Sequence, residues 1–156
     1  MLQVRFSIKF RGRNLAILVT ESGFGPDDFS VSGLIDNLDD LTEDLGVPLL
    51  GVDVPNTVKP ESLVPYFNRL ALIRIRFPGM ADGRGFSIAR KLRQLGYHGR
   101  LRAVGHLIPD QFRAAMRVGF DELEISEEQA IRQPESQWQG VKLTPSYQNR
   151  MRGTAA

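Results

Sequence analysis

"LALIRIRFPGMADGRGFSIARKLRQLGYHGRLRAVG", residues 70–105, reads as a strand, a helix and a second strand in close succession. Alternate residues of the first strand are apolar, as in a strand with one buried face: Ala71, Ile73, Ile75 and Phe77. Apolar residues then repeat at helical spacing, before Gly96 ends the pattern: Phe86, Ala89, Leu92 and Leu95. A strand, a crossover helix and a strand at this spacing predict a parallel βαβ unit.

The same alternation continues on both sides of this unit. A short apolar run at 48–54 predicts a buried strand, and the helix expected after it is short or kinked because Pro65 lies inside it. Residues 108–120 predict a helix that ends at Gly119, residues 121–125 a strand, and Ser126 the cap of a last helix. Four βα units over 47–133 therefore predict an α/β fold with a mostly parallel sheet, either doubly wound or a partial TIM-like barrel. A complete barrel needs about 250 residues.

The N-terminal part has a different pattern. Alternating residues at 2–10 and an apolar run at 15–20 predict a β-hairpin within residues 1–20, followed by a loop at 21–28. Apolar residues at helical spacing over 34–45 predict an amphipathic helix with an acidic outer face. We expect one domain over residues 1–135 and a C-terminal tail over 136–156 that is anchored by Trp138.

The composition is that of a water-soluble globular protein, with 42% hydrophobic and 24% charged residues in 156. No apolar run approaches the roughly 18 residues that a membrane span needs. The start of the chain alternates polar and apolar residues and lacks the core of a signal peptide, so we expect a cytoplasmic protein with no membrane contact.

The chain contains no cysteine and only two histidines, His98 and His106. Disulfides, thiolate zinc sites, thiol nucleophiles and cysteine-held iron–sulfur clusters are therefore excluded for this chain alone. No flavin or nicotinamide motif is complete either. We predict no metal site and no identifiable cofactor, and the sequence leaves open whether the protein is an enzyme.

Charge is unevenly distributed, although the net charge is only +2. The segment from Asn14 to Val58 holds nine acidic and no basic residues, whereas Arg69 to Arg117 holds eleven basic and two acidic residues. The basic half suits a small anion, an acidic partner or a nucleic acid. The simpler interpretation, which we favour, is that the two halves neutralise each other within the fold or across a homodimer.

The connection "MADGRG" at 80–85 is the strongest site candidate, because ligands of parallel sheets bind beyond the carboxyl ends of the strands. Gly83 and Gly85 permit close backbone approach, and the helix that follows presents free N–H groups to an anion. Arg84 adds a guanidinium fork, and Asp82 is expected to cap the helix or to hold Arg84 in place. The alternative is an ordinary turn between strand and helix.

Other polar residues are expected near the same edge. Asp110 and Gln111 begin the next helix, where Asp110 either converges on Arg84 or simply complements the helix dipole. Asp82, Asp110 and His106 are the candidates for acid–base groups, with no catalytic role assigned. Arg74, Arg76 and Arg102 fall on central strands, where a charge is costly to bury. These arginines therefore require an open sheet face, acidic neighbours or an anionic ligand.

Residues 77–125 carry a resemblance to a known family, on the pieces "FP…DGRG.S.AR.LR", "G.LRA.G", "DQ" and "GFD..E". The chain resembles the bacterial domain of unknown function 934 family, most specifically over residues 70–125. Two positions depart from the family pattern, which usually has aspartate where this chain has His106 and commonly cysteine where it has Val118. The retained polar positions are Asp82, Arg84, Ser87, Arg90, Arg93, Arg102, Asp110, Gln111 and Arg117.

The resemblance implies a link to sulfite reduction, since members of that family are often labelled oxidoreductases of this process by association with sulfate assimilation. We therefore expect an accessory protein that binds a small anion or an acidic redox partner, such as a sulfite reductase component, at the arginine-rich carboxyl face. The anion- or partner-binding candidates are Gly83, Arg84, Gly85, Arg102 and Gln111. The alternative is a small-anion or phosphorylated-metabolite enzyme that uses the "DGRG" loop. A nucleic-acid-binding module is the weaker alternative, because no aromatic platform for bases is evident.

Overall fold

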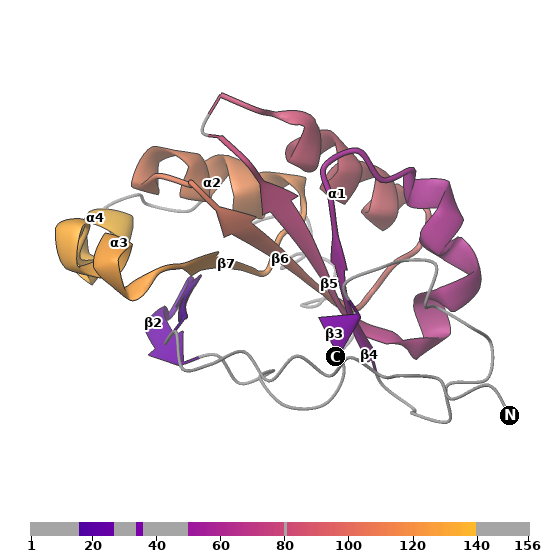
Figure 1. Cartoon of the computed structure of the whole chain (residues 1–156), viewed down its shortest axis with the longest axis horizontal. Helices are drawn as coiled ribbons and strands as arrows, with labels where there is room; N and C mark the ends of the chain where they lie inside the picture. Colours follow the sequence, from indigo (N-terminus) through magenta and orange to yellow (C-terminus); the bar gives the residue numbers. More distant parts are fainter. Residues whose placement is uncertain (1–15, 27–33, 36–49, 80, 140–156) are drawn as a thin grey trace, which may run out of the picture.

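A computed structural model describes residues 16–26, 34–35, 50–79 and 81–139 (Figure 1). The strands are β1 (Ile17–Thr20), β2 (Gly23–Pro26), β3 (Leu34–Ile35), β4 (Leu50–Val54), β5 (Leu70–Phe77), β6 (Arg100–Gly105) and β7 (Glu122–Ile125). The helices are η2 (Pro60–Arg69, a 3₁₀ helix), α1 (Arg84–Gln94), α2 (Pro109–Val118), α3 (Glu127–Arg132) and α4 (Glu135–Gln139). The α/β fold class predicted from the sequence is confirmed.

One sheet holds all seven of these strands in the order β2-β1-β7-β6-β5-β4-β3. Strands β3 to β7 are parallel, and β1 pairs antiparallel with both β7 and β2. From β3 to β7 each strand lies beside the previous one without a reversal of order. A doubly wound sheet needs such a reversal, so the described strands follow the barrel-like alternative of the two predicted arrangements.

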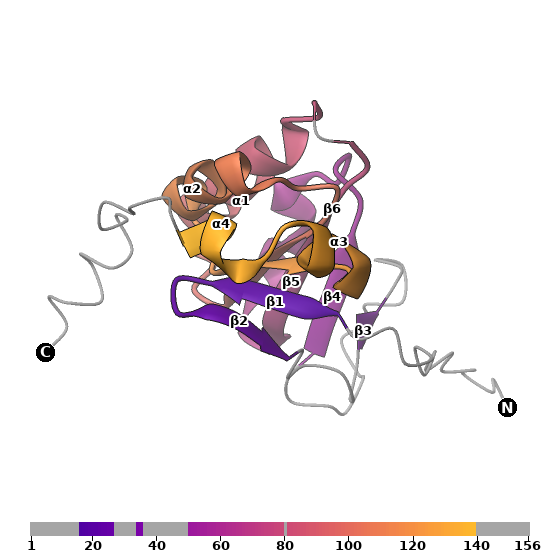
Figure 2. The same cartoon turned by 90° about the vertical axis from the view of Figure 1, so that its left-hand side faces the viewer.

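The helices η2, α1, α2 and α4 cover one face of this sheet, and α1 and α2 lie side by side over it (Figures 1 and 2). The strands turn their apolar side chains toward these helices, and Ile73, Ile75 and Phe77 of β5 are buried there as predicted. The opposite face of the central strands carries charged side chains. The strand period of two thus separates an apolar core from a polar face.

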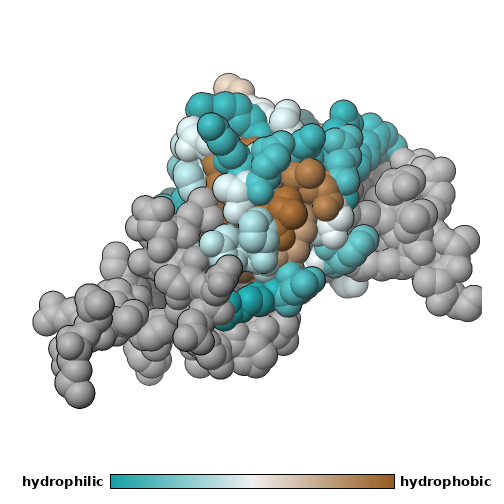
Figure 3. Space-filling view, turned by 90° about the vertical axis from the view of Figure 1, so that its right-hand side faces the viewer, coloured by the Kyte–Doolittle hydropathy of each residue, from teal (hydrophilic) through white to brown (hydrophobic). Residues whose placement is uncertain are grey.

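Trp138 of α4 belongs to the same core. It is fully buried, packs edge-on against Phe112 of α2, and donates its indole N–H to the Gln133 carbonyl oxygen at 3.0 Å. At the other end of the molecule, Figure 3 shows hydrophobic side chains exposed between hydrophilic ones on the side where η2 lies, and Val64 of η2 is 40% exposed.

Three N-terminal expectations change. The hairpin is confirmed, but its described arms are β1 and β2, so the loop predicted at 21–28 contains a strand; the arm predicted at 2–10 lies outside the described residues. The helix predicted over 34–45 is wrong at Leu34–Ile35, which form β3, and its remainder lies outside the described residues.

No helix in the described ranges is both long and apolar enough to cross a bilayer.

Candidate functional site: the carboxyl edge of the sheet

The loop between β5 and α1 is held by an ion pair that is local in the sequence. The Asp82 carboxylate accepts from Arg84 Nε at 3.0 Å and from Arg84 NH2 at 2.7 Å. It also accepts the Arg84 backbone N–H at 3.1 Å and the side-chain amide of Asn56, which follows β4. Asp82 therefore has both of the roles that the sequence suggested as alternatives. It caps α1 and it holds the Arg84 side chain in place.

These contacts fix the charge state of the pair. Hydrogen bonds from the Arg84 side chain and backbone hold the pKa of Asp82 well below its usual range, and the Asp82 side chain raises the pKa of Arg84. The Arg84 side chain is nevertheless 62% exposed. A planar guanidinium bound through Nε and NH2 on one side has a fixed orientation, and its NH1 group remains available. Arg84 is thus a positioned and permanently charged group at the protein surface.

The two glycines of the loop differ in their surroundings. A Cβ on Gly85 would lie 2.3 Å from the ring of Phe77, whereas a Cβ on Gly83 would meet no atom within 4 Å. Gly85 is therefore required so that α1 can pack against Phe77 of β5. This packing explains Gly85 without a ligand, while the anion-binding role predicted for Gly83 and Arg84 remains a prediction.

Arg102 does not join this loop but lies in a buried network on the sheet face opposite the helices. The register places Asp53, Arg74, Arg102 and Glu122 in one row across β4 to β7. Arg74 donates to Asp53 at 2.7 Å and to Glu124 at 2.7 and 2.8 Å. Arg102 donates to Glu122 at 2.9 Å and to Glu124 at 3.2 Å. Of the possibilities raised for the strand arginines, acidic neighbours are confirmed.

Arg76 extends the network to the surface. Its side chain is 58% exposed, and its guanidinium donates through Nε and NH2 to the same Asp53 oxygen, Oδ2. The other oxygen of this buried carboxylate, Oδ1, has no hydrogen-bond partner among the residues that the structure describes. Asp53 belongs to the acidic segment of the chain and both arginines to the basic one. In this cluster, the acidic and the basic segment of the chain therefore neutralise each other within the fold, as the simpler interpretation of the charge distribution predicts.

The remaining candidates lie at the ends of β6 and α2. Gln111 is a capping residue, because its side-chain oxygen accepts the Ile108 backbone N–H at 3.2 Å. Asp110 is exposed in the first turn of α2, where it complements the helix dipole. Among the described residues, Asp82 is the carboxylate that binds the Arg84 side chain. The structure thus brings Asp82 and Arg84 together and leaves Asp110 and Gln111 with helix-end roles.

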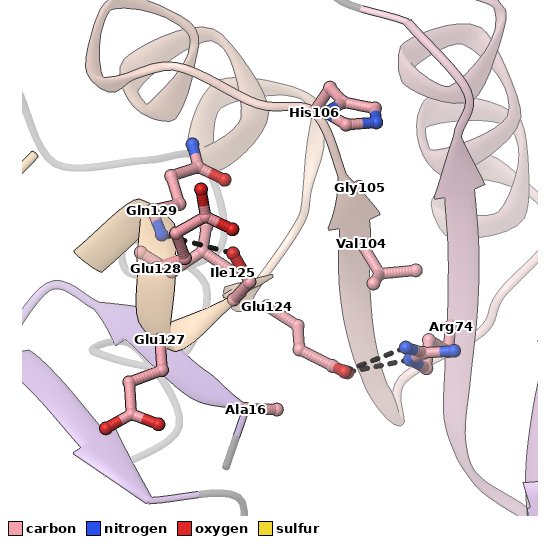
Figure 4. A pocket seen from close by; sticks show the side chains of 11 residues that line it. Ala16, Arg74, Val104, Gly105, His106, Glu124, Ile125, Glu127, Glu128 and Gln129 are labelled. Carbon is pink, nitrogen blue, oxygen red and sulfur yellow. Dashed lines mark hydrogen bonds and ion pairs between the residues drawn. The ribbon is translucent and has the colours of Figure 1, made fainter. Parts of the chain in front are cut away.

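His106 lines a cavity of about 500 Å³ that opens where β6 and β7 end (Figure 4). Its other polar lining comes from Arg74, Glu124 and the first residues of α3, which include Glu128 and Gln129. Within the described part of the chain, no three His, Asp or Glu side chains form a group suited to a metal ion.

Sequence reasoning missed two sets of partners. Asn56 was not singled out, because its contact with Asp82 spans 26 residues of sequence. Asp53, Glu122 and Glu124 were not named as partners of the strand arginines either. A signal was present, since "GVDV", "LIRIRF", "GRLRAV" and "DELEI" all alternate charged with apolar residues. The register between these strands determines which acidic residue pairs with which arginine.

Comparison with known proteins identifies the family. A family model described as "Bacterial protein of unknown function (DUF934)" matches residues 51–156, more than half of the chain. The chain belongs to this family. The family match includes every residue of the "DGRG" loop and of the buried network. Searches of curated proteins and of solved structures gave no significant match.

Proposed function

We propose that this DUF934 protein is an accessory protein of sulfite reduction, or more widely of sulfate assimilation, that docks an acidic redox partner. The link to sulfite reduction rests on the label often given to members of this family. The chain has no cysteine, so a thiolate-held redox centre would have to be carried by the partner. A docking role fits such a chain better than electron transfer by the chain itself.

The observation that carries the proposal is the charge of the exposed face of α1. This α1 surface consists of Arg84, Ser87, Arg90, Lys91 and Gln94, all exposed, and α1 contains no acidic residue. Arg84 begins it at the carboxyl edge of the sheet, where Asp82 fixes its orientation. Arg90 makes no ion pair or side-chain hydrogen bond with any described residue, and Lys91 has only a loose contact with Glu61 at 3.8 Å. An acidic partner meets positive charge along the whole helix.

The fixed orientation of Arg84 favours binding. An arginine that is free in solution loses side-chain freedom when it docks, at about 0.5–1.5 kcal/mol per immobilised side chain. A guanidinium that is already held in a bidentate pair has lost most of that freedom in the unbound protein. The NH1 group then supplies a second donor edge for a partner carboxylate or for a small oxyanion.

The test is capture of partners from cells that grow on sulfate as their sulfur source. We expect the tagged protein to recover sulfite reductase components, and Arg84→Ala and Arg90→Ala each to reduce the recovery. Arg132→Ala is the matched control, because Arg132 of α3 is also an exposed arginine with a carboxylate partner, Glu128 at 3.6 Å. Equal recovery with all three variants, or recovery of no specific protein, would contradict the proposal.

A further inference from the structure

The cavity at the ends of β6 and β7 is a second polar site, which the proposed function does not use. It has a volume of about 500 Å³, and its lining comes from β5, β6, β7 and α3 and from Ala16 before β1. Figure 4 shows Arg74 and Glu124 paired at one end and His106 at the other, with Glu128 and Gln129 on the α3 side. The lining does not include Arg84 or any other residue of the α1 surface.

Arg74 is the cationic side chain in the described lining of the cavity, and its guanidinium already binds two carboxylates. Its Nε and NH2 donate to Glu124, and its NH1 donates to Asp53. The side chain is only 2% exposed, and two carboxylates face its single charge. An oxyanion in the cavity would therefore compete with carboxylates that bind this guanidinium at 2.7 and 2.8 Å.

The groups with spare capacity on the α3 side are hydrogen-bond acceptors. The amide nitrogen of Gln129 donates to the Leu107 carbonyl oxygen and to Gln133, so its side-chain oxygen is left as an acceptor. Glu128 also lines the cavity on this side, and the ion pair of its carboxylate with Arg132 is loose at 3.6 Å. The His106 ring lies at the other end of the cavity.

A ligand that fits this pattern donates hydrogen bonds and carries positive charge. We infer that the cavity binds a small organic ammonium ion, whose N–H groups donate to the Glu128 carboxylate and the Gln129 side-chain oxygen. An ammonium group has three donors and no acceptor, so it complements these groups directly. The site therefore selects against sulfite, sulfate and phosphate. This inference does not depend on the proposed docking of an acidic partner.

Three probes of similar size separate the charge classes: ethanolammonium, ethylene glycol and glycolate. We expect ethanolammonium to shift the amide NMR signals of Ser126 and Gln129 and the ring signals of His106, with saturation in the millimolar range. Ethylene glycol should bind at least about tenfold more weakly, the factor that corresponds to losing one charge-assisted hydrogen bond. Glycolate should give no saturable shift. Saturation by glycolate, equal responses to all three probes, or no saturable response to ethanolammonium would overturn the inference.

Substitutions assign the site. Glu128→Gln should weaken ethanolammonium binding by about tenfold. Glu61→Gln should leave it unchanged, because Glu61 is also an exposed carboxylate, lies on η2 outside the cavity lining, and has a similarly loose partner, Lys91 at 3.8 Å. Because both side chains are exposed, neither change is expected to unfold the protein, and the dispersion of the amide spectrum verifies this. Equal affinities in the two variants would refute the role of Glu128.

Discussion

Substitution of Arg74 by methionine tests whether the buried ion-pair network holds the central strands together. The Arg74 guanidinium joins β5 to β4 through Asp53 and to β7 through Glu124, and it is 2% exposed. Methionine keeps much of the side-chain length but removes the charge and the three donor nitrogens, Nε, NH1 and NH2. Asp53 then keeps its contacts with Arg76, and Glu124 keeps its contact with Arg102.

The expected cost follows from these contacts. Removing one partner of a buried ion pair costs about 3–5 kcal/mol, because the other charge is left without compensation in a site that excludes water. Here two carboxylates lose a partner but each keeps another arginine, so we expect about 4 kcal/mol, within that range. The double variant Arg74→Met/Glu124→Leu also removes one of the two carboxylates that Arg74 neutralised, while Arg102 keeps its bond to Glu122. It should be more stable than Arg74→Met, because replacing a buried pair with apolar side chains is often neutral.

Urea unfolding measures both effects. With a slope of about 2 kcal/mol per molar urea, a loss of about 4 kcal/mol lowers the midpoint by about 2 M at unchanged slope. Arg132→Met is the control, since its exposed pair with Glu128 is worth about 0–1 kcal/mol. If Arg74→Met stays within 1 kcal/mol of Arg132→Met, or if the double variant is less stable than the single one, the reasoning about this network is refuted.

Two further predictions concern the "DGRG" loop. Gly85→Ala should destabilise the protein by about 2 kcal/mol, because its Cβ would overlap the buried Phe77 ring, whereas Gly83→Ala should stay within about 0.5 kcal/mol; equal urea midpoints would contradict this. Asp82 has a folded-state pKa below its unfolded value of about 3.9, so its contribution to stability is present above that pH and is lost as the pH falls below it. Carbon NMR should show the Asp82 carboxylate still ionised at pH 3 and its pKa raised by Arg84→Ala; an unshifted pKa in wild type would show that the ion pair does not form.

The parallel half of the fold could be predicted because its signals are local. The apolar alternation of β5 and the helical repeat of α1 each lie within about a dozen residues, and Gly96 and Gly119 adopt the positive φ expected of helix ends. Strand order is a property of the whole sheet, so the sequence did not decide between the doubly wound and the barrel-like arrangement. The side of the sheet that the helices cover depends on that order.

The N-terminal elements were harder to predict for identifiable reasons. β2 has the sequence "GFGP", in which glycine and proline disfavour strands, yet it pairs with β1 and α4 packs against it. A side chain at Gly23 would collide with Glu135 of α4, so this glycine serves a contact that is distant in sequence. Leu34 and Ile35 are two adjacent apolar residues, which fit a helix face and a short strand equally well.

The candidate-site contacts also divide into those that local sequence predicts and those that depend on how distant strands pair. The contact of Asp82 with Arg84 spans two residues and was anticipated from the loop itself. The separation of Arg102 from that loop depends on the register of β5, β6 and β7, which places Arg102 beside Arg74 and Glu122. The cavity beside His106 is lined by four separate stretches of the chain, so no single stretch of sequence indicates it.

The central claim, that the basic α1 surface docks an acidic redox partner, is tested most directly by the affinity of the purified protein for sulfite reductase as a function of salt. The account predicts a Kd that rises with NaCl concentration because charges at the rim of an interface are screened. At low salt, Arg84→Ala and Arg90→Ala should each weaken binding by about 5–10-fold, and Arg132→Ala should change it by less than about twofold. No measurable complex at low salt, or equal effects of the three substitutions, would contradict the claim.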